Sequence, residues 1–156
     1  MTIASTLQQY LTDHRVHFEM VTHSPTQTAS QTAQVSHISG KRIAKGVLLK
    51  DDQGYVLAVL PAARNIHFID LRRLTNRRLN LASEKEVGAL FADCEIGAVP
   101  PLGDAYGLEM VVDESLEEQS DIYLEGGDHT CLVHISHEDF HDLMNNASHG
   151  NFTRFN

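Results

Sequence analysis

Lys45 is the residue in this sequence with the clearest capacity for chemistry. It lies in the largely apolar segment Arg42–Leu49, which is typical of a β-strand. Because side chains alternate between the two faces of a strand, Lys45 shares a face with Ile43, Val47 and Leu49. An amine on an apolar face must reach water through a pocket or be paired, since burying it alone is costly. Lys45 therefore marks a pocket, or it is a solvent-exposed or snorkelling strand lysine.

A second candidate site is the loop Gly97-Ala98-Val99-Pro100-Pro101-Leu102-Gly103. Its two prolines fix the backbone and remove two N–H donors, whereas the flanking glycines permit positive φ angles and close approach. Gly46, next to the lysine, would also let a ligand approach the backbone closely. Such a loop can present main-chain groups to a polar ligand. The alternative is a plain turn between strands.

Several histidines late in the chain form a third group of chemically capable side chains, namely His129, His134, His137 and His141. His137 and His141 are four residues apart on an expected helix and can share a face. A metal site needs a third ligand, and no His-Glu-x-x-His motif is present, so we expect no metal. His129 follows the Gly126-Gly127 turn and opens a strand, where it can point into a cleft.

The sequence contains no recognisable catalytic nucleophile or nucleotide-binding fingerprint. Neither Cys94 nor Cys131 has a base close in sequence, and the Gly-x-Ser-x-Gly elbow, the P-loop and the Gly-x-Gly-x-x-Gly motif are absent. The two cysteines form no disulfide framework. No apolar stretch approaches the ~20 residues that span a bilayer, and the N-terminus lacks a signal-peptide pattern. We therefore expect a cytoplasmic protein with reduced thiols and no membrane association.

Charge is distributed unevenly along the 156 residues, whose formal net charge is -9. Residues 41–85 hold ten of the twelve Lys and Arg, whereas residues 86–156 hold one Arg and fifteen acidic residues. A basic middle segment can bind phosphates, because the local field matters more than the total charge. The alternative is a solvated helix face. The candidates for contacts with phosphates are Arg64, Arg72, Arg73, Arg77 and Arg78.

The elements that would position these residues include five helices. Helix-start signals are a capping serine at residue 5, Ser24-Pro25-Thr26-Gln27, the capping box Ser83-Glu84-Lys85-Glu86, and Ser136 with Asp139 three residues later. The second helix is expected to end near residue 35, the fourth near 91 and the last near 146. A short helix is expected over residues 70–77.

The strand pattern predicts the fold class. Strands are expected over residues 17–22, 42–49, 55–60, 96–99, 109–113, 121–124 and 130–135. The second and third form an antiparallel hairpin, and the third is apolar enough to be buried on both faces. We predict a single α+β domain over residues 1–156, with a mixed, mostly antiparallel and partly barrel-like sheet flanked by helices. Its core spans about residues 5–145, and the tail over 147–156 is expected to be frayed.

The order of these motifs resembles a known family. A strand with a central lysine is followed by a buried return strand, by Gly97-x-x-x-Pro101-Leu102-Gly103 and by a late Gly-Gly hairpin. This pattern is similar to that of the YbaK-type aminoacyl-tRNA deacylases, the free-standing relatives of the editing domain in bacterial prolyl-tRNA synthetases. The resemblance covers about residues 5–145.

The resemblance implies a trans-editing hydrolase that cleaves the ester between a wrong amino acid and the tRNA 3′ end. Lys45 would be the catalytic residue that stabilises the oxyanion or positions the ester, and the Gly97–Gly103 loop would hold the 3′ end by main-chain contacts. His23 and His129 would line the substrate pocket. The terminal ribose hydroxyl of the substrate would help to activate water, without a cofactor. The implied partners are aminoacyl-tRNA and, as a candidate, prolyl-tRNA synthetase. DNA is not expected to be a ligand.

Two other classes of function stay open at this stage. The chain could be a non-catalytic module of the same fold that binds tRNA or a nucleotide, although such a module needs neither the lysine nor the loop intact. A metal-dependent hydrolase is a weaker third hypothesis. The sequence does not identify which amino acid is removed, because that depends on how the pocket side chains pack.

Overall fold

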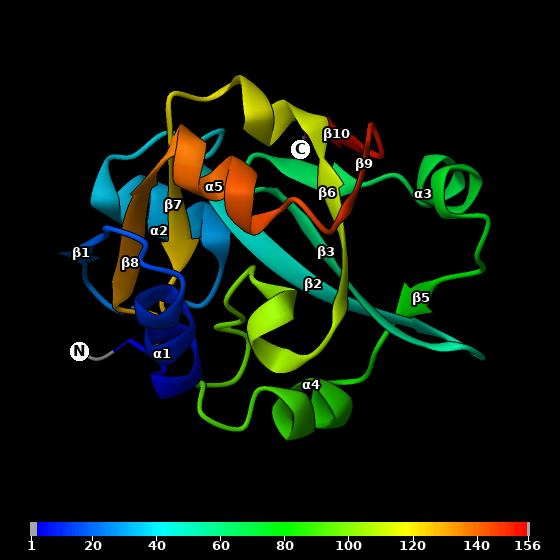
Figure 1. The fold of residues 1–156 in the computed structure, drawn as a ribbon, viewed down its shortest axis with the longest axis horizontal. Helices are drawn as coiled ribbons and strands as arrows, with labels where there is room; N and C mark the ends of the chain where they lie inside the picture. The colour runs from blue at the N-terminus through cyan, green and yellow to red at the C-terminus, as the bar shows by residue number, and fades with distance from the viewer. Residues whose placement is uncertain (1–2, 156) are drawn as a thin grey trace.

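A long hairpin of strands β2 (Ile43–Asp51) and β3 (Gly54–Pro61) lies at the centre of the computed structural model, which describes residues 3–155 (Figure 1). The Asp51 carboxylate accepts the N–H groups of Gln53 and Gly54 and so closes the turn. From residue 56 onward every residue of β3 is buried. The predicted hairpin, with its return strand buried on both faces, is confirmed.

Further strands extend the hairpin into an eight-stranded mixed sheet. Its order is β1-β8-β7-β2-β3-β6-β9, and β5 also pairs with β2. The additional strands are β1 (Glu19–Thr22), β5 (Asn80–Leu81), β6 (Glu109–Asp113), β7 (Asp121–Glu125), β8 (Cys131–Ser136) and β9 (Ser148–Gly150). The pairs β2–β7, β3–β6 and β6–β9 are parallel, and the other pairs in this sheet are antiparallel. The predicted mixed, mostly antiparallel sheet is confirmed. Within the described residues its end strands β1 and β9 do not pair with each other, so it is not closed.

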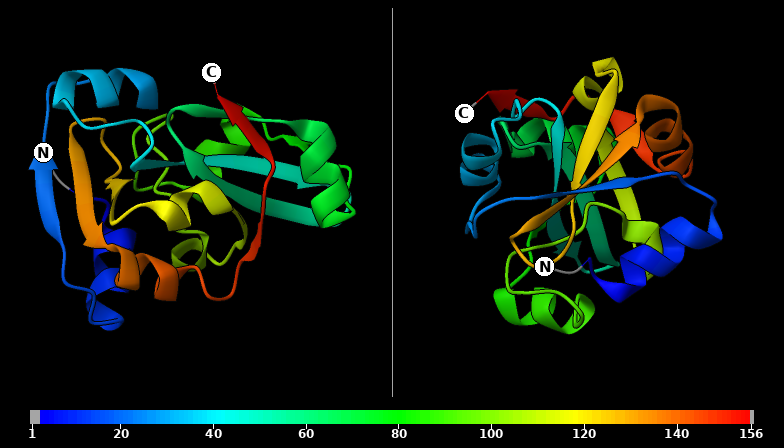
Figure 2. Two further views of the ribbon diagram at one scale, coloured as in Figure 1. Left: turned by 90° about the horizontal axis from the view of Figure 1, so that it is seen from above. Right: turned by 90° about the vertical axis from the view of Figure 1, so that its left-hand side faces the viewer.

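Five α-helices flank the sheet in residues 3–155, as predicted. They are α1 (Ser5–Asp13), α2 (Ala29–Ser36), α3 (Phe68–Thr75), α4 (Glu84–Leu90) and α5 (His137–Leu143). None of the helices in this part of the chain is long and apolar enough to cross a membrane. In Figure 2, α1 and α5 lie on one side of the sheet and α2 and α3 on the other.

Two of the four predicted helix starts are confirmed and two are wrong. The capping box of Ser83 and Glu86 and the Ser136 cap are both present. The start predicted at Ser24 is wrong, because the Thr28 side chain accepts the N–H of Gln31 and α2 begins only at residue 29. The cap predicted at residue 5 is also wrong, because that residue is already helical and no side chain caps the helix.

The two faces of β2 pack against different parts of the core. Ala44 and Leu48 join the largest apolar cluster, which includes residues of α1 and α5. Ile43 and Leu49 point to the opposite face, toward α2 and α3. This alternation confirms the strand register assumed for Lys45.

The chain after residue 147 is ordered, so the prediction of a frayed tail is wrong. β9 pairs with β6, and β10 (Thr153–Phe155) pairs with β4 (Arg64–Ile66) in a second, two-stranded sheet. Between them Phe152 is fully buried, and its N–H donates to the Asp113 carboxylate. Strand pairing and the burial of Phe152 therefore order this segment.

The strand predicted over residues 96–99 is also wrong. Gly97 has a φ of +80°, which a strand does not allow, and the Ile96 side chain is 78% exposed. The N–H of Ala98 instead donates to the carbonyl of Glu95. The segment is an irregular loop that packs against the sheet.

We predict that Phe152→Ala destabilises the protein by about 3–5 kcal/mol, because it leaves a cavity in a packed core. Phe155→Ala, which truncates a phenylalanine that is 60% exposed, is the matched control and should change stability little. Urea denaturation of both variants provides the measurement. If both substitutions change the free energy of unfolding equally little, the tail is frayed after all.

Candidate functional site

The edge of β2 opposite β3 is paired at both ends and open in the middle. β7 pairs with Ile43–Ala44, and β5 pairs with Leu49–Lys50. The carbonyl of Leu48 accepts the N–H of Ala82 on this edge. Main-chain groups alternate in direction along a strand, so the N–H and C=O of Gly46 point to the same edge. The gap between β7 and β5 thus exposes the backbone of Gly46.

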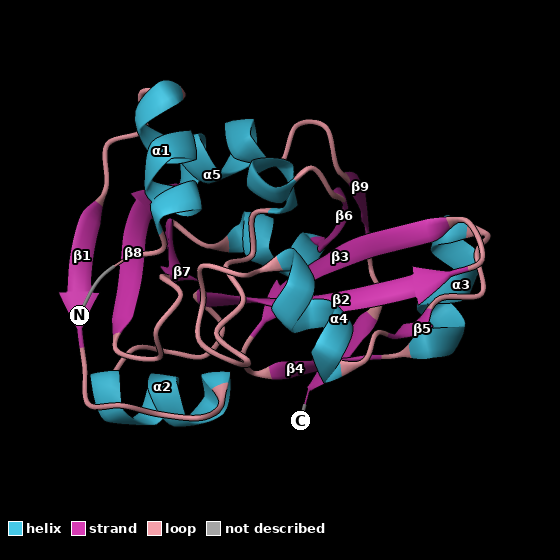
Figure 3. Cartoon of the chain, turned by 90° about the horizontal axis from the view of Figure 1, so that it is seen from below, coloured by secondary structure: helices cyan, strands magenta, loops and turns pink. Residues whose placement is uncertain are grey.

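A cavity of about 40 Å³, here called the lysine pocket, lies beside this gap. Figure 3 shows α2 and several loops around the region between the β7–β8 pair and the β2–β3 hairpin. The pocket is lined by Lys45 and by three other regions, represented by Thr28, Ala29 and Thr32 of α2, Gly97 and Val99 of the loop, and Glu125 and His129 at the β7–β8 turn. The fold therefore brings together five residues singled out from the sequence, Lys45, Gly46, Gly97, Val99 and His129.

The Lys45 amine has no partner of its own. Its side chain is half-buried, and within residues 3–155 it makes no ion pair or hydrogen bond. Burial lowers the pKa of Lys45 from its ordinary value, because the charged form loses hydration that no carboxylate replaces. An anionic ligand in the pocket would supply the missing interaction.

The first turn of α2 adds positive potential to the lysine pocket. The Thr28 side chain satisfies the N–H of Gln31, whereas in the described part of the chain the N–H groups of Ala29 and Ser30 have no partner. Unpaired N–H groups at a helix N-terminus attract negative charge. The helix terminus and Lys45 therefore favour the same kind of ligand, an anion or a carbonyl oxygen that becomes one.

His129 connects the β7–β8 turn to the loop. Its φ is +63°, and its Nε2–H donates to the carbonyl of Ile96 over 2.6 Å. The Glu125 carboxylate accepts the N–H groups of His129 and Gly127, so it supports the same turn. The imidazole of His129 also lies within 3.6 Å of where a Cβ on Gly97 would stand. These contacts fix the position of the loop at the mouth of the pocket.

Only part of the predicted Gly97–Gly103 loop reaches the pocket. Gly97 is exposed, and the N–H groups of Gly97 and Val99 have no partner among the described residues, so they are free to donate to a ligand. Ala98, Pro100 and Pro101 are buried behind it. Val99 and Pro101 pack directly over Gly46.

Gly103 serves packing rather than the pocket wall. A Cβ at this position would lie 2.7 Å from Met110 Cγ and 3.1 Å from the carbonyl oxygen of Leu108. Its N–H points at the sulfur of Met110 over 3.0 Å. The glycine is therefore required by close approach inside the core.

A larger cavity of about 250 Å³ adjoins the lysine pocket. The two cavities share Gly46, Gly97 and Val99, and the larger one continues along mainly apolar side chains of β2 and α4 and of Phe91. A small compartment beside Lys45 thus adjoins a larger, mainly apolar one. A ligand can place a small group in the first and a bulkier group in the second.

The remaining histidines lie away from the lysine pocket. His23 donates from Nδ1 to the carbonyl of Ser24 and does not line the pocket. His134 pairs with Asp121, and His137 and His141 both face the Glu117 carboxylate. Across residues 3–155, no three His, Cys, Asp or Glu side chains are arranged to hold a metal ion.

The five arginines differ in how far their charge is already used. Arg77 binds Asp51 through two nitrogens and also Glu109, and this pairing lowers the pKa of Asp51 to about 2. Arg72 donates to the carbonyl of Leu79. Arg64 approaches the Thr153 carbonyl and hydroxyl at 3.4–3.5 Å. The exposed side chains of Arg73 and Arg78 have no partner in the described part of the chain.

Sequence reasoning missed the contributions of α2 and Glu125 to the pocket. A signal for α2 existed, because Thr28 is followed three residues later by Gln31, whose side chain accepts the N–H of Gln27. The Ser24-Pro25 pattern matched the usual helix start more fully, so the start at Thr28 was not predicted. No local pattern marks Glu125, which acquires its place through the β7–β8 turn.

Comparison with known proteins identifies the family. The aminoacyl-tRNA editing domain matches residues 23–143, and the chain belongs to this family. The predicted relationship to the aminoacyl-tRNA editing domains is therefore confirmed. None of the curated protein sequences matches the chain.

Solved structures share the fold. One is provisionally described as a trans-editing enzyme for prolyl-tRNA synthetase, with 24% identity, a TM-score of 0.82, and coverage of 97% of this chain and 96% of that one. Another comes from a study of epitope backbone grafting onto scaffold proteins, with 22% identity, a TM-score of 0.82 and the same coverage. A third, from Marinobacter aquaeolei VT8, is provisionally described as a signal-transduction protein. It has 23% identity and a TM-score of 0.79, and the match covers 95% of this chain but 30% of that one.

We predict that Lys45→Met raises thermal stability, by about 0.5–2 kcal/mol, because it removes a charge that burial penalises without a partner. The gain is full below the folded-state pKa of Lys45 and shrinks as the pH rises from there toward the ordinary value of 10.5. The control is Lys50→Met, which breaks an exposed pair with Glu86 and should bring no gain. Thermal melts across pH 7–11 test this. A lower stability of Lys45→Met at pH 7 would contradict the claim that the charge of Lys45 destabilises the fold.

Proposed function

We propose that this protein hydrolyses the ester of mischarged aminoacyl-tRNA in trans, as the free-standing YbaK-type deacylases do. The observation that carries the proposal is the unpaired, half-buried Lys45 amine beside free N–H groups of Gly97 and Val99. Membership of the aminoacyl-tRNA editing domain family supports the substrate class. The provisional description of one similar structure as a trans-editing enzyme is consistent with it.

In the proposed reaction, Lys45 and the loop stabilise the transition state. Water adds to the ester carbonyl carbon, the C=O electron pair moves to oxygen, and the resulting oxyanion is stabilised by the Lys45 ammonium and loop N–H groups. The attacking water loses one proton by way of the neighbouring ribose hydroxyl. When the tetrahedral intermediate collapses, the C–O bond to the ribose breaks, the ribose oxygen takes up that proton as the terminal hydroxyl of tRNA, and the free amino acid is released. The second ribose hydroxyl of the substrate helps to activate the water, so no protein general base is required.

The size of the lysine pocket supports a preference for small amino acids. The lysine pocket is the smaller of the two adjoining cavities, about 40 Å³ against about 250 Å³ for its neighbour. Ala29, Thr32 and Ile43 enclose it on the α2 side. A methyl or hydroxymethyl group fits such a space, whereas a branched side chain does not. The ester then lies at the pocket mouth, with the terminal ribose beyond it.

Contacts outside the pocket complete the proposal. Of the five arginines, Arg73 and Arg78 are the best candidates for the tRNA backbone, because their charges are not committed to this chain's own acidic or carbonyl groups. Arg77 is the weakest candidate, since Asp51 and Glu109 already neutralise it. Prolyl-tRNA synthetase remains the proposed protein partner. We place the reaction in the cytoplasm, where charged tRNA is used.

We predict that Lys45→Met reduces deacylation of mischarged tRNA by about 100–1000-fold under single-turnover conditions, because it removes one oxyanion-stabilising group. Lys50→Met on the same strand, whose charge is paired with Glu86, should retain near-normal activity. Rates are measured with radiolabelled aminoacyl-tRNA at saturating protein. Normal turnover by the Lys45 variant would remove this residue from the chemistry. Tight binding without hydrolysis by the wild type would favour the non-catalytic module.

We also predict that the rate falls as the esterified amino acid grows. A panel of tRNAs charged with alanine, serine, cysteine, threonine or proline should give fastest hydrolysis of alanine and serine, and slowest hydrolysis of threonine and proline, because the pocket lacks room for larger groups. The parameter to compare is kcat/KM. Faster hydrolysis of the larger residues would show that the side chain does not enter the lysine pocket.

A further inference from the structure

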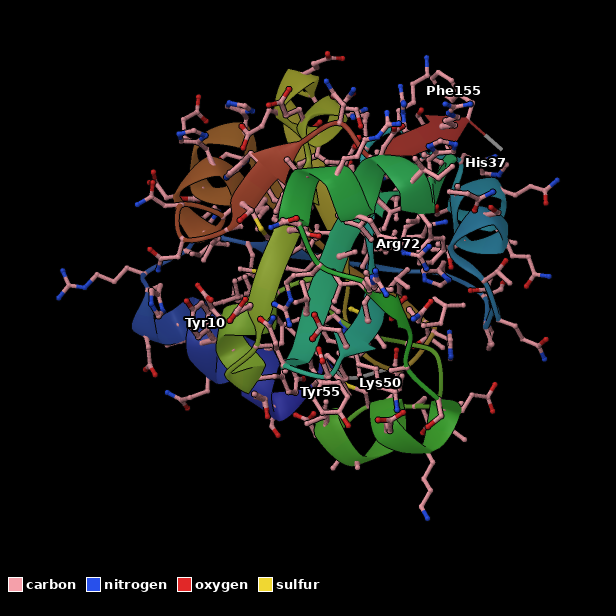
Figure 4. All side chains as sticks on the ribbon, turned by 90° about the vertical axis from the view of Figure 1, so that its right-hand side faces the viewer. Tyr10, His37, Lys50, Tyr55, Arg72 and Phe155 are labelled. Carbon is pink, nitrogen blue, oxygen red and sulfur yellow. The ribbon has the colours of Figure 1, made fainter. Side chains whose placement is uncertain are left out.

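Four residues from three separate segments form an exposed patch, here called the Phe155 platform. They are Lys41 before β2, Arg64 in β4, and Arg154 and Phe155 in β10. The Phe155 side chain is 60% exposed although it is wholly apolar, and Figure 4 shows it at the surface of the molecule. Arg154 is 68% exposed. Two of these cations, Arg64 and Lys41, lie against the exposed ring, in a chain whose net charge is -9.

Arg64 and Lys41 both lie close to the Phe155 ring. Antiparallel pairing of β10 with β4 places Phe155 opposite Arg64, whose guanidinium carbon lies 4.1 Å from the ring centroid. The Lys41 ammonium lies 5.7 Å from the same centroid. Arg154 precedes Phe155 in β10, so its side chain leaves the opposite face of the strand, where it is 68% exposed and reaches Asp70 at 4.0 Å. The ring is thus held in place while much of its surface stays open.

A polar hollow of about 130 Å³ lies beside the ring. It is lined by Lys41, Arg64 and Phe155 together with Ser115, Glu118 and Gln119. The hydroxyl, carboxylate and amide groups can exchange hydrogen bonds with the edge of a planar polar ring. Aromatic faces that stack on bases, together with cations that pair with phosphates, are the two features by which proteins bind single-stranded nucleic acid.

The platform lies within reach of the lysine pocket. Lys41 precedes Lys45 by four residues, so their Cα atoms are no more than about 14 Å apart even if the chain is fully extended. A single strand whose terminal ester lies at the pocket mouth can span this distance. The 3′ end of tRNA is single-stranded, so its bases are free to stack on a protein side chain.

We propose that the Phe155 platform binds the single-stranded 3′ end of the tRNA substrate. One base just before the terminal adenosine stacks on Phe155, and Lys41, Arg64 and Arg154 pair with the flanking phosphates. The inference rests on the proposed function, because it presumes that the ester enters the lysine pocket. It adds a subsite that recognises polynucleotide rather than the reacting ester.

We predict that Phe155→Ala raises KM for aminoacyl-tRNA by about 5–150-fold, the range expected for one lost base-stacking contact. The kcat for this substrate should be unchanged, and so should the hydrolysis of the same amino acid esterified to adenosine alone. Phe155→Trp, which keeps an aromatic face, should retain the wild-type KM. The melting temperature of each variant is measured on the same preparation.

A charge test accompanies the stacking test. Arg154→Ala should flatten the dependence of log affinity on log salt by about 0.7, the value for one phosphate of a single strand. Arg15→Ala, which removes one exposed charge at the end of α1, is the matched control and should leave the slope unchanged. An unchanged slope in Arg154→Ala would remove this arginine from the platform.

The outcomes separate this inference from the proposed function. If the wild type hydrolyses neither aminoacyl-tRNA nor the aminoacyl-adenosine ester, the proposed function fails, and the inference fails with it. If the wild type hydrolyses both and Phe155→Ala behaves like the wild type, the inference alone is overturned. An equal loss toward both substrates also overturns it, because Phe155 would then support only the fold.

Discussion

An amine that is half-buried without a carboxylate partner is the constraint around which the site of this protein is arranged. Lys45 cannot be part of the apolar core, because its charge would be stranded there. It needs access to solvent or ligand in a strand that is buried on either side, at Ile43–Ala44 and at Leu48–Leu49. The fold provides that access by leaving the edge of β2 unpaired between β7 and β5.

The groups around the unpaired part of the β2 edge are suited to binding a ligand. On one side, the first turn of α2, which has unpaired N–H groups, lines the pocket with Ala29 and Thr32. On the other, the loop carries free N–H groups at Gly97 and Val99, held in place by the His129 contact and by packing over Gly46. The loop N–H groups that we assign to the oxyanion are held in place before substrate arrives. Such preorganisation is the usual source of electrostatic catalysis.

The sequence was most informative where local chemistry decides structure. The hairpin, the Ser83 and Ser136 helix caps and the face of Lys45 follow from alternation and capping, and all are present. The sequence was misleading where contacts between residues far apart in the chain determine the structure. Burial of Phe152 orders the tail, and a positive φ at Gly97 turns an expected strand into a loop.

The composition of the site was only partly predictable for the same reason. Lys45 and Gly97 could be found because an amine in an apolar strand and a proline loop between glycines are both conspicuous. Glu125 and Thr32 could not, because only the tertiary fold brings them to the pocket. Nor could the sequence distinguish Arg77, committed to Asp51, from the uncommitted Arg73.

The central claim is that Lys45 contacts the carbonyl oxygen of the scissile ester. The most direct test is a crystal structure with a non-hydrolysable analogue in which an amide joins alanine to the 3′ position of adenosine. The account predicts the amide oxygen within about 2.7–3.2 Å of Lys45 Nζ, with the alanine methyl group in the lysine pocket. An analogue bound with its carbonyl oxygen out of reach of Lys45 would contradict the account.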